Sequence, residues 1–378
     1  MTISGPEAGG QEGVQRIIDA VHQRFSVKEE YLREEGVEFF LEEGQRETKR
    51  NFVSLTDELR KTGDGALLRN TDHGLLLVVF KKPVRKPQRL KMPLILLAAT
   101  IITIAADGFL RASSYADPLT PRLGLSEEIF VAAVYTIALI GIIGIHELGH
   151  KIASWHHKMD SSWPFFIPGI PGVWPTMGAV ISASDPPTNR DALFDLGLSG
   201  PIAGLIVTVI VSIVAAATAQ VIPASSYPSG TQFGSADYFT SFLTGLFKPT
   251  ATNGVLVGPL FYLLYFAYSI GFLITFINLL PAWQLDGGHI TNSAVSPRVH
   301  QILTYVSVLV MILIGFYLMA FLVLIMAGRT PSLRPLDDVS PLSNKRKVFF
   351  VLTWVLSASI FFFAIYNNAF FGAVSLIH

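Results

Sequence analysis

The stretch IFVAAVYTIALIGIIGIHELGHKIASW, residues 129–155, decides the fold because it joins a membrane-length apolar run to a metal-binding pattern. A helix of about 20 apolar residues can cross the hydrocarbon core of a bilayer. On such a helix His146 and His150, the two ends of HELGH, project from one face and can share a Zn²⁺. Glu147 lies beside them, placed to accept a proton from a metal-bound water. Ionisable groups in a membrane helix cost several kcal/mol unless compensated, so we expect a metal here; the alternative is polar side chains satisfied within a helix bundle.

The composition indicates that lipid is the solvent for most of the chain. Of its 378 residues 51% are hydrophobic and only 15% are charged, against about 25% in a typical soluble protein. The 28 basic and 28 acidic residues balance, so there is no electrostatic reason to expect nucleic acid as a partner. The sequence contains no cysteine, so any zinc site must be built from His, Asp and Glu.

Membrane-length apolar stretches recur along the chain after residue 91. They predict an all-α polytopic membrane protein of about six transmembrane helices, with a small N-terminal α+β soluble domain before them. The six stretches lie near residues 92–110, 129–151, 195–220, 257–280, 301–327 and 348–373.

The distribution of basic residues predicts the orientation in the membrane. The segment KKPVRKPQRLK, residues 81–91, carries six basic residues and no acidic one directly before the first apolar stretch. By the positive-inside rule we expect this segment and the N-terminal domain to be cytoplasmic, in a multi-pass protein of the cell membrane. The basic loop 328–347 conflicts with six simple crossings, which would place it outside. Either 301–327 is not a single crossing or the rule fails locally.

The N-terminal region reads as a small domain preceded by a polar tail. Residues 1–12 are Gly-rich and polar, and we expect them to be disordered. Residues 13–91 are expected to form a cytosolic α+β domain with its basic linker, which docks on the membrane portion because so small a unit holds itself weakly. The pattern predicts helices within 14–25 and 46–63 and strands at 37–43, 66–70 and 74–80, the last two joined by a turn at 71–74.

A hydrolytic zinc needs a third protein ligand from another element, and Asp286 is the best candidate. It lies in FINLLPAWQLDGGHI, residues 276–290, at the end of the fourth apolar stretch. Pro281 removes a backbone donor there and Gly287-Gly288 loosens the chain that follows. Irregular backbone at membrane depth is tolerated only inside protein or beside a wet cavity, where a carboxylate favours a cation. The alternative is that Asp286 merely caps a helix or turn.

Two further segments are expected to pack around the metal. Residues 163–183, WPFFIPGIPGVWPTMGAVISA, hold too many Pro and Gly for one helix yet are apolar enough for membrane depth. We expect a re-entrant loop or hairpin whose free edge can pair with an extended peptide; the alternative is a turn-rich surface loop. Residues 197–205, GLSGPIAGL, present a face of small residues that permits close packing behind the metal-binding helix.

HELGH on one apolar helix, followed by NLLPAWQLDG at residues 278–287, resembles the site-2 protease family of intramembrane zinc metalloproteases. The resemblance covers about residues 92–300, and the lack of a PDZ domain, with a soluble segment before the first span, looks like the archaeal and plastid EGY-like branch. It implies a transmembrane metalloprotease domain at 92–378 with its core at 129–300. It also implies functions for matching residues: zinc ligands His146, His150 and Asp286, catalytic base Glu147, substrate-positioning Asn278, and structural Pro281 and Gly287.

The function implied is hydrolysis of peptide bonds in transmembrane segments of membrane proteins, as in regulated intramembrane proteolysis. The expected partners are a transmembrane protein substrate and the lipid bilayer, and the expected cofactor is Zn²⁺. The alternative class is a multi-pass metal-binding transporter or a catalytically silent membrane-binding protein, because His/Asp clusters also mark ion pathways. Glu147 separates the two classes, since hydrolysis requires it and zinc binding does not.

Overall fold

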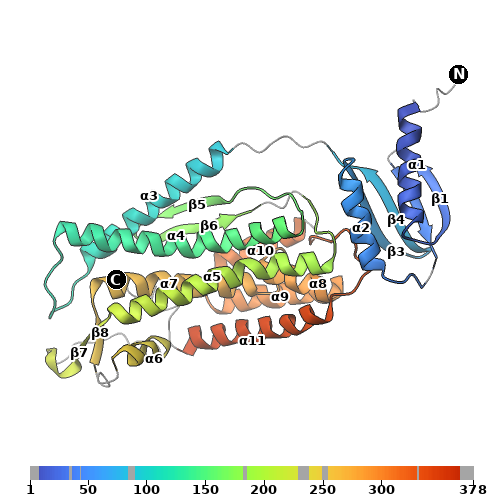
Figure 1. Cartoon of the computed structure of the whole chain (residues 1–378). Helices are drawn as coiled ribbons and strands as arrows, with labels where there is room; N and C mark the ends of the chain where they lie inside the picture. The colour runs from blue at the N-terminus through green and yellow to red at the C-terminus, as the bar shows by residue number, and fades with distance from the viewer. Residues whose placement is uncertain are drawn as a thin grey trace.

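A computed structural model of the chain describes residues 8–33, 36–42, 44–83, 90–181, 185–228, 238–248, 254–329 and 332–366. A small α+β domain lies at one end of the molecule and a bundle of apolar helices makes up the rest (Figure 1). Four of the described helices are long and apolar enough to cross a bilayer: α3 (Lys91–Ser114), α4 (Leu125–His156), α5 (Arg190–Thr218) and α7 (Pro259–Leu279). The mostly helical architecture predicted for the membrane portion is confirmed in this form.

The N-terminal domain packs two helices against a four-stranded antiparallel sheet of order β1-β2-β4-β3. Alternate residues of β2 are buried, as the period of a half-buried strand requires. Strand β1 was not predicted, because its sequence VKEEYLR is charged and nearly all of it is exposed at the sheet edge. The elements are α1 (Ala8–His22), β1 (Val27–Arg33), β2 (Gly36–Leu41), α2 (Thr48–Arg60), β3 (Asp64–Thr71) and β4 (Gly74–Lys81).

Two predictions at the ends of this domain fall partly on residues that the structure does not describe. Helix α1 begins at Ala8, so residues 8–12 are helical where disorder was expected, and residues 1–7 lie outside the described part of the chain. Most of the basic linker 81–91 also lies outside it, since residues 84–89 are not described.

A segment from the far end of the sequence docks the N-terminal domain on the helical bundle. The Leu68 N–H of β3 donates to the Leu336 carbonyl at 2.9 Å, and Leu336 N–H donates to the Pro187 carbonyl at 2.8 Å just before α5. Residues 336–338 thus cover the free edge of β3, and the partly buried Leu336 and Val339 pack against the core of the domain. The predicted docking is confirmed.

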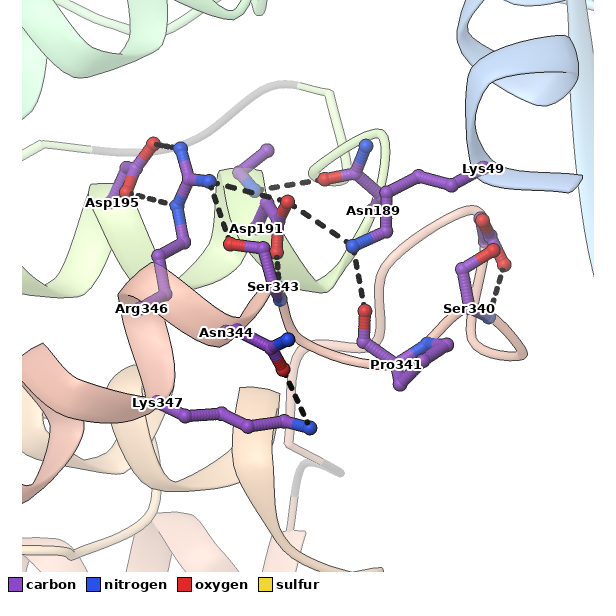
Figure 2. Close-up of polar contacts among 12 residues, drawn as sticks. Lys49, Asn189, Asp191, Asp195, Ser340, Pro341, Ser343, Asn344, Arg346 and Lys347 are labelled. Carbon is purple, nitrogen blue, oxygen red and sulfur yellow. Dashed lines mark hydrogen bonds and ion pairs between the residues drawn. The ribbon is translucent and has the colours of Figure 1, made fainter. Parts of the chain in front are cut away.

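Ion pairs extend this junction to α2, α5 and α11 (Asn344–Tyr366). Figure 2 shows Lys49 of α2 between Asp191 of α5, at 3.1 Å, and the Pro341 carbonyl, at 2.6 Å. Arg346 of α11 reaches Asp191 at 3.2 Å and pairs with Asp195 through two nitrogens. Ion pairs therefore connect the beginnings of α2, α5 and α11 at the face of the bundle where the N-terminal domain lies.

The fifth predicted crossing, 301–327, is two helices, so the expectation of six simple crossings is wrong here. Helix α9 (Pro297–Leu313) and helix α10 (Tyr317–Arg329) pack on each other and are joined by a turn at Gly315, whose φ of +87° suits glycine. The chain therefore reverses, and the basic loop after α10 returns to the N-terminal domain (Figure 1). Helix α11 then covers the last predicted span up to residue 366, and residues 367–373 lie outside the described part.

The Pro/Gly-rich segment 163–183 forms the predicted hairpin. Strands β5 (Phe165–Ile170) and β6 (Trp174–Val180) pair antiparallel and pack against both α3 and α4 (Figure 1). The hairpin packs on helices that have the length and composition of membrane spans, and regular strands stand where the alternative expected a turn-rich loop; its depth in a bilayer stays a prediction. The remaining elements are β7 (Gln220–Pro223), η1 (Ala224–Ser226), α6 (Tyr238–Phe247), β8 (Gly254–Val257) and α8 (Asp286–Ala294).

Candidate metal centre

Three predicted ligand residues converge where α4 meets the start of α8. His146 Nε2 lies 3.2 Å from Asp286 Oδ2, and His150 Nε2 lies 3.3 Å from Asp286 Oδ1. The two Nε2 atoms are 3.2 Å apart. Ligand atoms about 2.0 Å from a tetrahedral zinc ion are about 3.3 Å from one another. The spacing therefore matches three corners of a zinc tetrahedron, and among the described residues this is the His/Asp/Glu group that could hold a metal ion.

Asp286 reaches the histidines because the chain reverses between α7 and α8. Helix α7 ends at Leu279, and the Trp283 that follows takes a φ of +43° while its N–H donates to Thr304 Oγ1 at 3.0 Å. A Cβ at Gly287 would overlap the Leu279 carbonyl. The glycines after Asp286 thus permit a close approach of backbone, whereas the sequence had suggested that they loosen the chain.

The interruption predicted at Pro281 is confirmed, and it places Asp286 at the first position of α8. Its carboxylate faces His146 and His150, so capping alone does not account for its position. The N-terminus of a helix also favours a negative charge, which stabilises the carboxylate there.

Helix α5 forms the wall behind the two histidines. His150 Nδ1 donates to the Leu196 carbonyl at 2.8 Å, so Nε2 keeps its lone pair free for a metal. A Cβ at Gly200 would overlap the His150 imidazole, and one at Gly204 would lie 3.0 Å from His146 Cβ. The predicted packing of the 197–205 face against the metal-binding helix is confirmed, and its physical reason is the space that the imidazoles occupy.

Glu147 and Asn278 border the same group. Glu147 is 6% exposed on α4, and no donor in the described part of the chain hydrogen-bonds its carboxylate. Asn278, in the last turn of α7, places Nδ2 3.3 Å from His146 Nε2. The five residues named from sequence thus lie on α4, the end of α7 and the start of α8, and their chemical functions stay predictions.

Sequence reasoning missed two features of the bundle. The Leu196 carbonyl is a backbone group, for which no residue type gives a signal. Asp107 and Arg111 of α3 form a buried ion pair with Nε to Oδ2 at 2.7 Å. Their signal was present, because an acid and a base four residues apart in an apolar helix are both costly and able to pair.

Comparisons with known proteins bear on this geometry. Residues 134–322 match the profile of "Peptidase family M50". The "Probable zinc metalloprotease EGY1, chloroplastic" of Arabidopsis thaliana is 27% identical over 242 residues, which cover 60% of this chain and 42% of that protein. The EGY1 protein of Oryza sativa subsp. japonica, with the same description, is 29% identical over 180 residues, covering 44% of this chain and 29% of that protein. No solved structure matches the chain.

The chain spans about two fifths or less of the length of these relatives. The relatives are described as probable zinc metalloproteases, in agreement with the resemblance found in the sequence and with the His-His-Asp group. The matched region covers half of the chain and contains both HELGH and NLLPAWQLDG. The chain therefore belongs to peptidase family M50, with distant homology to the plastid EGY1 and EGY2 zinc metalloproteases.

Proposed function

We propose that this protein is a zinc-dependent endopeptidase that hydrolyses peptide bonds in the transmembrane segments of other membrane proteins. The observation that carries the proposal is the convergence of Asp286, at the start of α8, with His146 and His150 at tetrahedral spacing on α4, a helix long enough to span a bilayer. Three protein ligands leave one position open, as in hydrolytic zinc sites. The N-terminal domain would then lie in the cytoplasm, by the charge of the linker before α3.

In this proposal His146 Nε2, His150 Nε2 and Asp286 hold the zinc. When bound, the zinc supplies Lewis-acid polarisation of the scissile carbonyl and lowers the pKa of a coordinated water. Glu147 accepts the proton of the attacking water on its carboxylate and passes that proton to the leaving amine nitrogen. Its burial, and the absence of a hydrogen-bond donor to it among the described residues, suit such a base. The Asn278 amide, beside His146, orients the substrate backbone at the centre.

The hairpin β5–β6 offers a place for the substrate. A two-stranded sheet leaves backbone groups unpaired on its outer edges, and an unwound peptide can add to such an edge as a further strand. The substrate helix must unwind first, since helical carbonyls are hydrogen-bonded and shielded. Gly, Pro or Asn near the cleavage site would lower that cost.

The test is cleavage of a transmembrane peptide by the purified protein in liposomes loaded with zinc. Glu147→Gln and Asp286→Asn are compared with the unsubstituted protein and with Glu128→Gln, a carboxylate in the first turn at the other end of α4. We expect loss of cleavage in the first two variants only, with zinc content retained in Glu147→Gln and reduced in Asp286→Asn. Equal cleavage by all four proteins would overturn the proposal. Zinc binding without cleavage by the unsubstituted protein would favour a silent metal-binding protein or a transporter.

A further inference from the structure

A second buried polar cluster lies in the bundle, away from the metal centre. The fully buried Asp107 carboxylate of α3 accepts four hydrogen bonds. Arg111 donates through Nε to Oδ2 at 2.7 Å and through Nη2 to Oδ1 at 3.3 Å. Tyr135 of α4 donates its hydroxyl to Oδ2 at 2.8 Å, and the Gly172 N–H donates to Oδ1 at 2.8 Å. Each carboxylate oxygen is thus held by two donors.

The Asp107–Arg111 ion pair within α3 does not account for the hydrogen bond from Gly172 to Asp107. Asp107 and Arg111 are one turn apart on α3 and would pair without any hairpin. Gly172, however, belongs to the turn between β5 and β6 and has a φ of +81°. If the turn lies at membrane depth, as the proposed function requires, its N–H has no water to bond, and leaving it unsatisfied would cost several kcal/mol. The carboxylate supplies a charged acceptor, which makes a stronger bond than a neutral one.

The cluster also ties the hairpin turn to the surrounding helices. The Arg111 guanidinium lies 3.6 Å from the ring centroid of Phe266 on α7, a cation–π contact. Together with Tyr135 on α4, the network joins α3, α4 and α7 to the turn at Gly172. The turn is therefore connected, through this network, to three helices.

The other end of the hairpin is fixed close to the metal centre. Lys151 follows His150 directly on α4, and its Nζ donates to the Ser161 carbonyl at 2.6 Å, just before β5. Tyr135 precedes His146 by eleven residues on α4, which is roughly 16 Å of helix. The Asp107 cluster therefore does not touch the reacting groups, and it determines the position of the far end of the hairpin.

We propose that Asp107 is a positioning residue that holds the turn of the β5–β6 hairpin, so that the strand edge offered to substrate stays aligned along α4 toward the metal centre. The inference rests on the proposed function, because the hairpin is taken as the substrate edge. Loss of the Gly172 bond leaves the hairpin more mobile, and ordering it then opposes substrate binding. Thr103 Oγ1 of α3 still donates to the Pro175 carbonyl at 3.1 Å, so the hairpin is loosened and stays in place.

Two double variants separate the effect of losing the hydrogen-bond acceptor for Gly172 from the effect of losing the buried charges. Asp107→Asn/Arg111→Met removes both charges and keeps an amide oxygen for Gly172, whereas Asp107→Leu/Arg111→Met removes the charges and the acceptor together. Neither leaves an unpaired buried charge, which single substitutions would do. Tyr135→Phe is a further control, because it removes one donor to Asp107 and leaves the Gly172 bond.

The first measurement does not require proteolysis. The sequence contains no cysteine, so Val173→Cys places a single spin label on the turn, at a residue that is 59% exposed. We expect higher label mobility in the Leu/Met variant than in the Asn/Met variant, Tyr135→Phe and the otherwise unsubstituted protein. A label at Ile137→Cys, on the exposed face of α4, should report no difference.

The second measurement is the kinetics of cleavage of a transmembrane peptide. We expect the Leu/Met variant to raise KM about tenfold relative to Asn/Met, with kcat changed less than about twofold and zinc content equal. Equal mobility and equal KM in the two double variants would overturn the inference. If the unsubstituted protein cleaves nothing while the Leu/Met turn is still the more mobile, the proposed function fails and the positioning of the turn stands.

If the Leu/Met variant does not fold, amide hydrogen exchange in the unsubstituted protein supplies the test. The Gly172 amide is expected to exchange slowly, because its hydrogen bond to Asp107 protects it although the residue is exposed. Exchange as fast as that of an exposed loop would overturn the inference.

Discussion

Two polar clusters contact the same helix, α4, and they satisfy their buried atoms in opposite ways. At Asp107 both carboxylate oxygens are filled by donors of the protein. At His146, His150 and Asp286 three lone-pair atoms converge, and within the described residues the Asn278 amide is the protein donor that lies beside them. Polar groups at membrane depth need partners, so the first cluster is complete as protein and the second is complete with a cation. The difference is the one expected between a structural cluster and a metal-binding one.

Metal removal should give the largest effect, and it should act on one cluster only. We expect a zinc chelator to reduce cleavage of a transmembrane peptide at least about a thousandfold, because the Lewis acid is lost. Restored zinc stabilises by about 4 kcal/mol when its free concentration is a thousand times Kd, so the unfolding midpoint should rise on reloading. Calorimetry with and without zinc measures the second effect. An unfolding midpoint that does not change with zinc would contradict the assignment of His146, His150 and Asp286 as a metal site.

At the Asp107 cluster, the free energy of unfolding should depend on whether the buried charges are paired and not on metal. Asp107→Leu leaves Arg111 buried without its partner, and we expect a loss of about 3–5 kcal/mol in the free energy of unfolding. The Asp107→Leu/Arg111→Met variant, with no charge left, should lose clearly less. Denaturant unfolding of both variants in detergent gives the comparison. Equal losses would show that the cost does not come from the unpaired guanidinium.

Glycines of α5 lie against the two histidines of the metal centre, so replacing one should change the affinity for zinc. Gly200→Ala puts a methyl group where the His150 imidazole lies, so we expect zinc affinity to fall about 10–100-fold as the ring is displaced. Gly141→Ala on α4 is the matched control, since its Cβ would meet Val207 at an ordinary 3.8 Å. Zinc titration with a competing chromophoric chelator measures both affinities. Unchanged affinity in Gly200→Ala would mean that α5 does not set the position of His150.

The junction with the N-terminal domain should give the smallest effect. Lys49→Ala removes contacts to Asp191 and Pro341, and partly exposed ion pairs are worth about 0.5 kcal/mol. We expect little change in global stability but faster limited proteolysis between β4 and α3, as the domain undocks more often. Arg50→Ala, which loses only an exposed pair with Glu47, should leave the proteolysis rate unchanged. Equal rates in both variants would exclude Lys49 as a docking contact.

The sequence predicted that His146, His150 and Asp286 lie together because the signals of these residues are local or energetically costly. HELGH has the spacing of a helix face, and Asp286 is a charge in a broken apolar segment. Strand β1 gave no signal, since its charges hide the alternation of a strand. The reversal at Gly315 depends on one glycine within an apolar run, where length alone suggests a single helix. The edge of β3 is covered by residues 336–338, a pairing between distant segments that no local period can indicate.

The position of Leu336 and Val339 in the N-terminal core has a consequence for the order of events during synthesis. The sheet of this domain ends at Lys81, yet its last core side chains are made about 255 residues later. At about 5–20 residues per second the domain waits roughly 13 to 50 s for them. Over that interval the edge of β3 lacks this partner, and it can be covered only after α9 and α10 have been synthesised. The first domain to leave the ribosome is thus among the last to be finished, because its completion requires that the chain through α10 has been made.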